Sequence, residues 1–130
     1  MGSEMCIRDS AYLSMWLTAD TLRNGAASGH YYENYVVMEL AKNYAYAKSK
    51  VNITYFRDSN AKEIDVFIEG NNVIHPLEIK KSAAPDRREI KKYSVIDKAS
   101  LNRGNGGIIC MCEEPIPIDK DNCFIPSNLI

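Results

Sequence analysis

The chain has 130 residues, a formal net charge of −1, and 45% hydrophobic and 25% charged residues. This length suits one domain with one core, and the charge gives no general attraction to nucleic acid. No apolar run is long enough to span a bilayer, and the chain does not start like a secretory signal. We therefore expect a cytoplasmic protein with no membrane association. The four cysteines follow no disulfide or zinc pattern, so we expect buried thiols.

The first ten residues, MGSEMCIRDS, fit none of the patterns that follow. They resemble the translation of sequencing-adaptor DNA, so we interpret residues 1–10 as a non-native segment and leave them out of the fold. Residues 11–130 then form a single domain. Residues 11–22 carry apolar side chains at roughly helical spacing, and we expect Trp16 to anchor the core rather than to stack on a base.

The longest helical pattern runs from Gly29 to about Lys48, with Ser28 as its N-cap. Glu33 lies on the same face as the apolar stripe of this helix. Two interpretations of Glu33 are open: a carboxylate stabilised by the helix N-terminus, or an inward acid that has a functional partner. The stripe itself consists of Val36, Val37, Leu40, Ala41 and Tyr44.

Residues 62–81 predict a β-hairpin, because apolar and polar residues alternate on both sides of Asn71-Asn72. Asn tolerates the left-handed conformation that a two-residue hairpin turn needs. In that register Gly70 faces Val73. The apolar residues of the first strand then share one face of the sheet: Ile64, Val66 and Ile68.

The same register brings four charged side chains to one side of the sheet. Asp65 lies opposite Glu78, and Glu63 lies opposite Lys80. Directly opposed carboxylates destabilise a sheet unless one is protonated or a cation lies between them. Oxygen ligands favour a hard ion such as Mg²⁺ or Mn²⁺, so the pattern predicts a metal-dependent site that cleaves phosphodiesters. A three-residue loop would instead point the two acids to opposite faces.

The remaining segments complete a mixed pattern. Residues 52–58 predict a strand in which Arg57 either pairs with a nearby acid or contacts a phosphate. Residues 86–99 predict a helix, residues 107–112 a buried strand, and residues 123–130 a short last strand or tail. The basic residues of the predicted helix are either solvated or in contact with a nucleic-acid backbone: Arg87, Arg88, Lys91 and Lys92.

The element order is therefore α-β-β-β-α-β-β. This order predicts an α/β fold in which a mixed sheet is flanked by helices. The helix between the second hairpin strand and the strand at residues 107–112 predicts a right-handed crossover between parallel strands.

Several of these positions resemble the signature of the PD-(D/E)XK nuclease superfamily, which includes type II restriction enzymes and archaeal Holliday-junction resolvases. The matching residues are Glu33 on a helix, Asp65 in a strand and Glu78-Ile79-Lys80 in the next strand. The resemblance implies a restriction-endonuclease-like fold in which Asp65, Glu78 and the carbonyl of Ile79 hold Mg²⁺ or Mn²⁺. It further implies that Lys80 orients water and that Glu33 supports the metal site. Ile64 departs from the signature, which has Pro at this position.

A second resemblance covers nearly all of residues 11–130. The strings SGHYYENYVVMEL, YFRD, EIDVFIE and PLEIKKSAAP look like the uncharacterised C-terminal domain that follows an AAA-type ATPase module in bacterial and archaeal proteins. This resemblance implies that the chain is the C-terminal fragment of a longer ATPase protein. Two functions are then expected: a Mg²⁺-dependent nuclease that acts on DNA, or a non-catalytic module that binds DNA or a partner of the ATPase.

Overall fold

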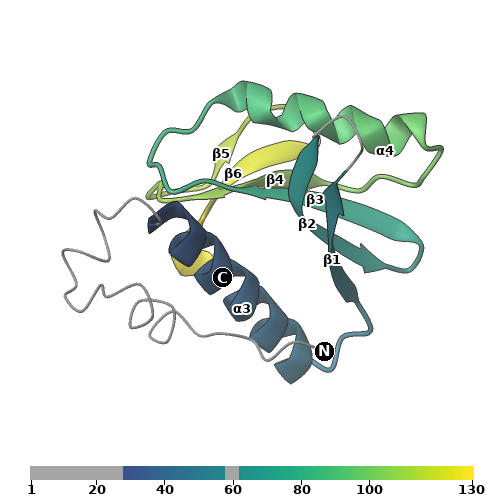
Figure 1. The fold of residues 1–130 in the computed structure, drawn as a ribbon, viewed down its shortest axis with the longest axis horizontal. Coiled ribbons are helices and arrows are strands. Elements are labelled where there is room, and N and C mark those ends of the chain that lie inside the picture. The colour runs from purple at the N-terminus through teal and green to yellow at the C-terminus, as the bar shows by residue number, and fades with distance from the viewer. Residues whose placement is uncertain (1–27, 58–61) are drawn as a thin grey trace.

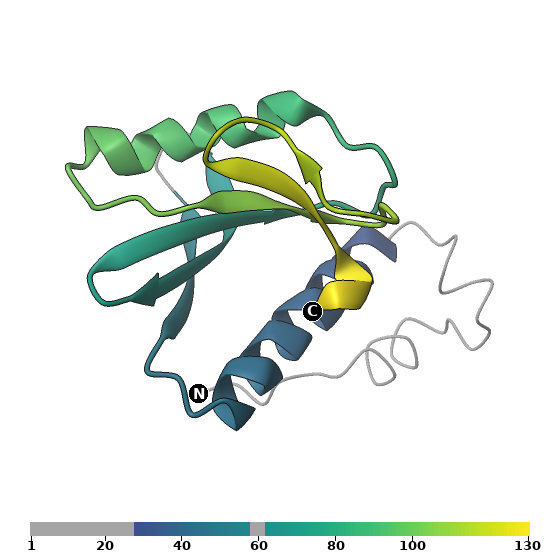
Figure 2. The same ribbon diagram turned by 180° about the vertical axis from the view of Figure 1, so that it is seen from behind.

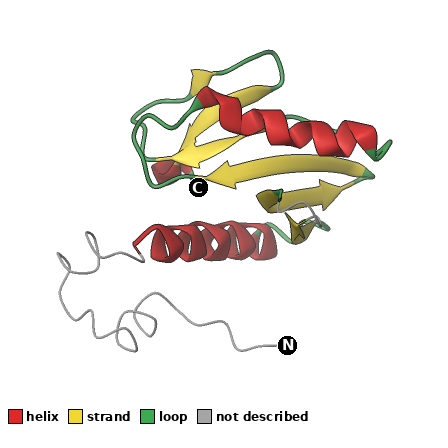
Figure 3. Ribbon diagram, turned by 45° about the horizontal axis from the view of Figure 1, so that its top comes forward, coloured by secondary structure: helices red, strands yellow, loops and turns green. Residues whose placement is uncertain are grey.

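The computed structural model describes residues 28–57 and 62–130. The predictions for residues 1–10, for residues 11–22 and for Trp16 lie outside the described residues. Within the described part, a six-stranded mixed sheet has helical segments on both of its faces, which confirms the predicted α/β class (Figures 1 and 3).

The elements follow the predicted order, with a two-residue strand and a closing 3₁₀ helix added near the C-terminus. They are α3 (Ser28–Tyr46), β1 (Asn52–Arg57), β2 (Glu63–Gly70), β3 (Val73–Ile79), the 3₁₀ helix η1 (Arg87–Tyr93), α4 (Ser94–Lys98), β4 (Gly106–Cys110), β5 (Ile116–Pro117), β6 (Asn122–Pro126) and the 3₁₀ helix η2 (Ser127–Leu129).

The helix expected over residues 86–99 consists of η1 followed by the short α4, rather than one α-helix. Side chains three residues apart eclipse one another in a 3₁₀ helix. Ile90, Tyr93 and Ile96 have this spacing, and all three pack in one cluster against the sheet. The start agrees with the prediction, because the side chain of Asp86 accepts a hydrogen bond from the backbone N–H of Arg88.

The strand order in the sheet is β1-β2-β3-β4-β6-β5. β1, β2 and β3 pair antiparallel, and β4 pairs parallel with both β3 and β6. The parallel pairing of β3 with β4 confirms that a crossover through η1 and α4 joins them. This segment covers the face of the sheet opposite α3, as Figure 2 shows from behind.

The hairpin of β2 and β3 has the predicted turn and register. Asn71 and Asn72 have φ angles of 53° and 62°, the left-handed values of a two-residue turn. Gly70 pairs with Val73, and the ladder continues in this register through a last rung between Val66 and Leu77.

The prediction that Ile64 shares a face with Val66 and Ile68 is wrong. Val66 and Ile68 pack under α3, whereas Ile64 packs with Tyr93 on the other side. The cause is a β-bulge between β1 and β2. Thr54 pairs with Phe67 and Phe56 pairs with Ile64, so two residues of β2, Asp65 and Val66, oppose Tyr55 alone. The extra residue shifts the alternation of β2 before it reaches the hairpin.

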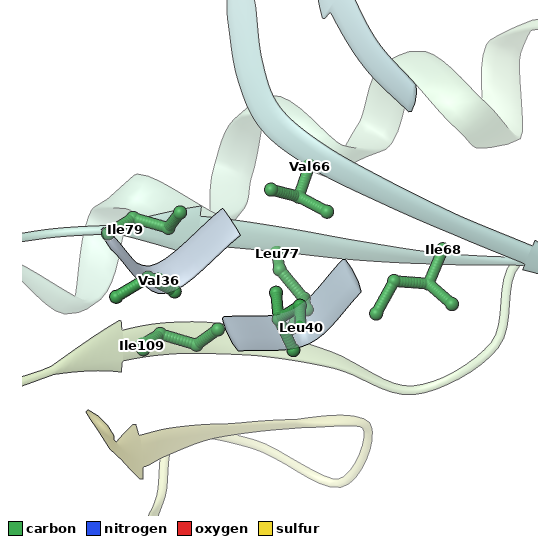
Figure 4. Close-up of a cluster of buried hydrophobic side chains, with 7 residues drawn as sticks. All are labelled: Val36, Leu40, Val66, Ile68, Leu77, Ile79 and Ile109. Atoms are coloured by element: carbon green, nitrogen blue, oxygen red, sulfur yellow. The ribbon is translucent and has the colours of Figure 1, made fainter. Parts of the chain in front are cut away.

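The core beneath α3 fixes this helix to the sheet. Val36 and Leu40 from α3 meet side chains of three strands (Figure 4). The strand residues of this cluster are Val66, Ile68, Leu77, Ile79 and Ile109. The predicted apolar stripe of α3 is therefore confirmed. The packing of this stripe on the sheet fixes where Glu33, on the same helix, lies relative to the strands.

The described cysteines are buried to different degrees, and the expectation of buried thiols holds for Cys110 alone among them. The cysteines in the described residues are free thiols, with Cys110 buried and Cys112 and Cys123 partly exposed. None of the helices in the described part combines the length and the apolar character that a bilayer crossing requires.

Candidate functional site

The residues of the predicted site come from three elements that meet at one end of the sheet. Glu33 lies in the second turn of α3, Asp65 lies at the bulge of β2, Glu78 lies in β3, and Lys80 follows β3 directly. Because β2 runs antiparallel to β3, the beginning of β2 lies beside the end of β3. The hairpin register and the docking of α3 therefore bring the four residues to one region.

Asp65 reaches across to the backbone of β3. Its Oδ2 accepts a hydrogen bond from the backbone N–H of Ile79 at 2.8 Å, just beyond the last rung of the ladder. Burial raises the pKa of Asp65 to about 6 although this hydrogen bond opposes the shift, and the charges of Glu78 and Glu33 raise it further. Asp65 is therefore a strained carboxylate that is mostly ionised only above about pH 6.

Glu33 stands between two hollows. One, of about 190 Å³, is lined by Glu33 and Asp65 together with residues of β1. The other, of about 270 Å³, is lined by Glu33, Ile79 and Lys80. The side chain of Glu33 is 40% exposed, and its Oε2 lies 3.9 Å from Nδ1 of His30. Glu33 is thus a rim carboxylate that solvent and a ligand can both reach.

Glu78 differs from the other two acids because it is 2% exposed. Its Oε1 accepts from Nζ of Lys92 at 2.7 Å and lies 3.0 Å from Nζ of Lys80. Its Oε2 is buried and has no hydrogen-bond partner. One oxygen of this carboxylate is therefore shared by two ammonium groups, and the other is left without a donor.

A second acid completes this ion cluster. Oε2 of Glu89 lies 3.2 Å from Nζ of Lys92 and 3.8 Å from Nζ of Lys80. Burial by itself lowers the pKa of each lysine, but the hydrogen bond and charge of Glu78, with Glu89, outweigh it, so both pKa values are raised. Both ammonium groups therefore stay charged at neutral pH.

Glu63, predicted to lie opposite Lys80, has its ion pair with a residue of β1 instead. Oε1 of Glu63 lies 2.7 Å from Nε of Arg57, and Lys80 pairs with Glu78 and Glu89 instead. The physical reason is the bulge, which removes Glu63 from the register of the hairpin. The same contact confirms the ion-pair interpretation of Arg57.

The basic residues of η1 have mostly intramolecular partners. Arg87 donates to the carbonyl of Pro117 at 2.7 Å, and Arg88 forms a forked pair with Asp86. Lys92 is held in the ion cluster, and Lys91 is exposed. Lys91 is thus the member of this set best placed to contact a phosphate backbone, whose binding by the segment stays a prediction.

The donor atoms fit a hard cation in kind but are not assembled around one point. Carboxylate oxygens of Asp65, Glu78 and Glu33 match the ligands that Mg²⁺ prefers, and the buried Oε2 of Glu78 has no other partner. Over residues 28–57 and 62–130, however, no three His, Cys, Asp or Glu side chains are arranged to hold a metal ion. Lys80 and Lys92 already neutralise the negative charge of Glu78 that would attract a cation.

Sequence reasoning missed Glu89 as part of this cluster, because a Glu in a first turn is expected there for the helix dipole alone. The available signal was its position three residues before Lys92, a spacing that allows an ion pair.

The comparisons with known proteins give a family for the described part of the chain. The family described as "Domain of unknown function (DUF4143)" matches residues 28–130. Neither the curated proteins nor the solved structures gave a match.

Proposed function

Since the chain belongs to the DUF4143 family, whose description names no activity, we propose that it is a Mg²⁺- or Mn²⁺-dependent nuclease module that hydrolyses phosphodiesters of DNA. The observation that supports this proposal is the meeting of Asp65 with the segment Glu78-Ile79-Lys80. Asp65 is hydrogen-bonded to Ile79 at 2.8 Å, and Glu33 and Lys80 line the same adjoining hollow. This is the arrangement that the resemblance to the PD-(D/E)XK superfamily implies, and a restriction-endonuclease-like fold is part of the proposal.

In this proposal Asp65, Glu78 and the carbonyl of Ile79 hold the cation, and Glu33 supports the site from its rim. A bound divalent cation would supply a lowered pKa for an attacking water and would offset charge on the phosphate. The pKa of Asp65, about 6, leaves its carboxylate ionised and able to bind at neutral pH. Lys91 would hold the nucleic-acid backbone, with Arg87 and Arg88 beside it.

Lys80 acts as a charged donor in this proposal and not as a base. Burial by itself lowers its pKa, but the hydrogen bond that Lys80 donates to Glu78 and the charges of Glu78 and Glu89 outweigh this, so the pKa is raised. A protonated amine can donate a hydrogen bond to water and stabilise negative charge that develops on a phosphate, but it cannot remove a proton. The proton of the attacking water would then pass to solvent or to the rim carboxylate of Glu33, which is 40% exposed.

The test begins with cation binding, measured as the melting temperature of the 130-residue chain with and without Mg²⁺ or Mn²⁺. A ligand that binds only the folded state raises stability, by about 1.4 kcal/mol at ten times its Kd. Asp65→Asn and Glu78→Gln should each remove the shift. Glu63→Gln is the matched control, because Glu63 is an exposed acid on the same strand that is paired with Arg57. A shift that survives both site substitutions would contradict the proposed metal site.

Cleavage is tested next, on supercoiled plasmid, single-stranded and branched DNA. Lys80→Met should abolish cleavage and keep the cation shift, since Lys80 is not a ligand in this proposal. Absence of cleavage in a protein that still shows the Asp65-dependent shift would remove the nuclease assignment and leave cation binding.

A second function is favoured by one observation, the neutralisation of Glu78 by Lys80 and Lys92 in a nearly solvent-free position. A carboxylate held in this way can serve as a structural ion cluster, in a domain that binds DNA or a protein without turnover. Such a module would keep its affinity for DNA or for its partner in the Asp65→Asn, Glu78→Gln and Lys80→Met proteins. A nuclease would lose cation-dependent behaviour in the first two.

We also propose that this domain follows an AAA-type ATPase module in a longer cytoplasmic protein. The resemblance of residues 11–130 to the C-terminal domain that follows such ATPase modules supports this arrangement. Sequencing the genomic DNA upstream of the codon for Ala11 tests it, and a stop codon in frame just before that codon would refute it.

A further inference from the structure

The lysine that binds Glu78 most closely is not part of the nuclease-like signature. Lys92 comes from η1, on the face of the sheet opposite α3, and its Nζ lies 2.7 Å from Oε1 of Glu78. A carboxylate that is 2% exposed is strongly destabilised unless an opposite charge accompanies it. Lys92 supplies the closer of the two positive charges at Glu78, and Lys80 supplies the other at 3.0 Å.

Lys92 also has a second acid within reach. Oε2 of Glu89, three residues earlier in η1, lies 3.2 Å from Nζ of Lys92. The side chain of Glu89 is 31% exposed, so its carboxylate can remain solvated with or without a partner. A small movement of one flexible side chain would therefore transfer the ammonium from Glu78 to Glu89 without leaving Lys92 unpaired.

We propose that Lys92 is a built-in lock on the metal site, which pairs with Glu78 in the cation-free protein and with Glu89 when a divalent cation is bound. This inference rests on the proposed function and adds its regulation. A cation would bind at the unpartnered Oε2 of Glu78, and its charge would repel the ammonium of Lys92 that lies at Oε1 of the same carboxylate. Lys92 is thus a positioning residue for Glu78.

Lys80 is less suited to this exchange. Its backbone N–H is tied to the carbonyl of Ile109 at 2.9 Å, its side chain already lines the hollow beside Glu33, and Glu89 lies 3.8 Å from its Nζ. We therefore assign the lock to Lys92 and keep Lys80 at the substrate side.

The lock is tested with Lys92→Met, which keeps an unbranched side chain and removes the charge. The cation-free melting temperature should fall by about 5 °C, because Glu78 loses its closest counter-charge. The Kd for Mg²⁺, followed by thermal shift, should fall by at least about fivefold, because only one of the two ammonium groups, that of Lys80, then remains at Glu78. Lys98→Met is the matched control: Lys98 is an exposed lysine in α4, the helix that directly follows η1, so neither quantity should change.

A second variant keeps the test decisive if Lys92→Met does not fold. Glu89→Gln removes the alternative partner at a partly exposed position, so Mg²⁺ should bind about fivefold more weakly. Unchanged Mg²⁺ affinity in Lys92→Met, or in Glu89→Gln if only that variant folds, would overturn the lock while Asp65-dependent binding in the original protein leaves the proposed function standing. Absence of binding in the original protein and in every folded variant would overturn both.

Discussion

Replacing Asp65 by Asn should stabilise the cation-free protein at high pH. The structure raises the pKa of this carboxyl from 3.8 to about 6, chiefly by burial. The folded state therefore holds the proton more tightly than the unfolded state does. Burial of Asp65 therefore carries no charge penalty below pH 3.8, where the carboxyl is protonated in both states. The penalty on the ionised carboxylate grows as the pH rises from 3.8 towards 6, and it is complete above that value.

The size of the penalty follows from the shift. A shift of about two pKa units corresponds to about 2.7 kcal/mol, and solvent screening of a side chain that is only partly buried reduces this to about 1 kcal/mol. An Asn side chain has nearly the same shape, carries no charge and can still accept the hydrogen bond from Ile79. Asp65→Asn should thus gain about 1 kcal/mol relative to the original protein between about pH 4 and pH 8.

Urea denaturation of both proteins at several pH values measures this difference. Glu63→Gln controls for the loss of an exposed acid from the same strand, and it should not reproduce the gain. If the difference in unfolding free energy between Asp65→Asn and the original protein does not change with pH, burial does not strain this carboxylate. The assignment of Asp65 as the acid poised for a cation would then lose its physical basis.

Three further predictions concern the scaffold. Asn72→Gly should stabilise the hairpin by up to about 1 kcal/mol, because Asn72 has a φ of 62°; an unchanged urea midpoint would contradict this. Tyr93→Phe should cost about 1 kcal/mol in the same assay, since the buried hydroxyl donates to the carbonyl of Gly107 at 2.6 Å; a neutral substitution would argue against that bond. Cys112 should react with a maleimide faster than Cys110, because burial raises the pKa of Cys110 to about 11; peptide mapping that shows equal labelling would refute this.

Much of the fold could be predicted from local signals. The Asn71-Asn72 turn and the alternation on both sides of it determined the hairpin register, and the stripe of α3 identified the face that packs on the sheet. The bulge at Asp65 could not be predicted in this way, because it depends on how β1 pairs with β2. One unmatched residue in that ladder moved Ile64 to the opposite face and Glu63 to Arg57.

The approach of Asp65 to the end of β3 could be predicted from the sequence, whereas the contacts of Glu78 could not. The spacing of Asp65 and Glu78 around the turn brought both acids to one end of the sheet, as expected. The partner of Glu78 was not foreseen, because Lys92 lies in another element and looked like one basic residue among several. Long-range contacts of this kind depend on where the crossover segment of η1 and α4 packs on the sheet. Residue patterns alone do not specify this position.

Asp65 and Glu78 lie on neighbouring strands, close enough for the charge of Glu78 to raise the pKa of Asp65. The structure compensates the negative charge of these two residues in different ways. Glu78 is compensated by two ammonium groups, whereas Asp65 has a backbone hydrogen bond and partial exposure. Neutralising substitutions should therefore act in opposite directions at pH 8. Asp65→Asn should stabilise the cation-free protein, and Glu78→Gln should destabilise it by about 2 kcal/mol, because it leaves Lys80 and Lys92 with a weaker partner. Urea denaturation of the two variants side by side decides this, and destabilisation by both would mean that Asp65 is a structural acid like Glu78 and is not held ready for a cation.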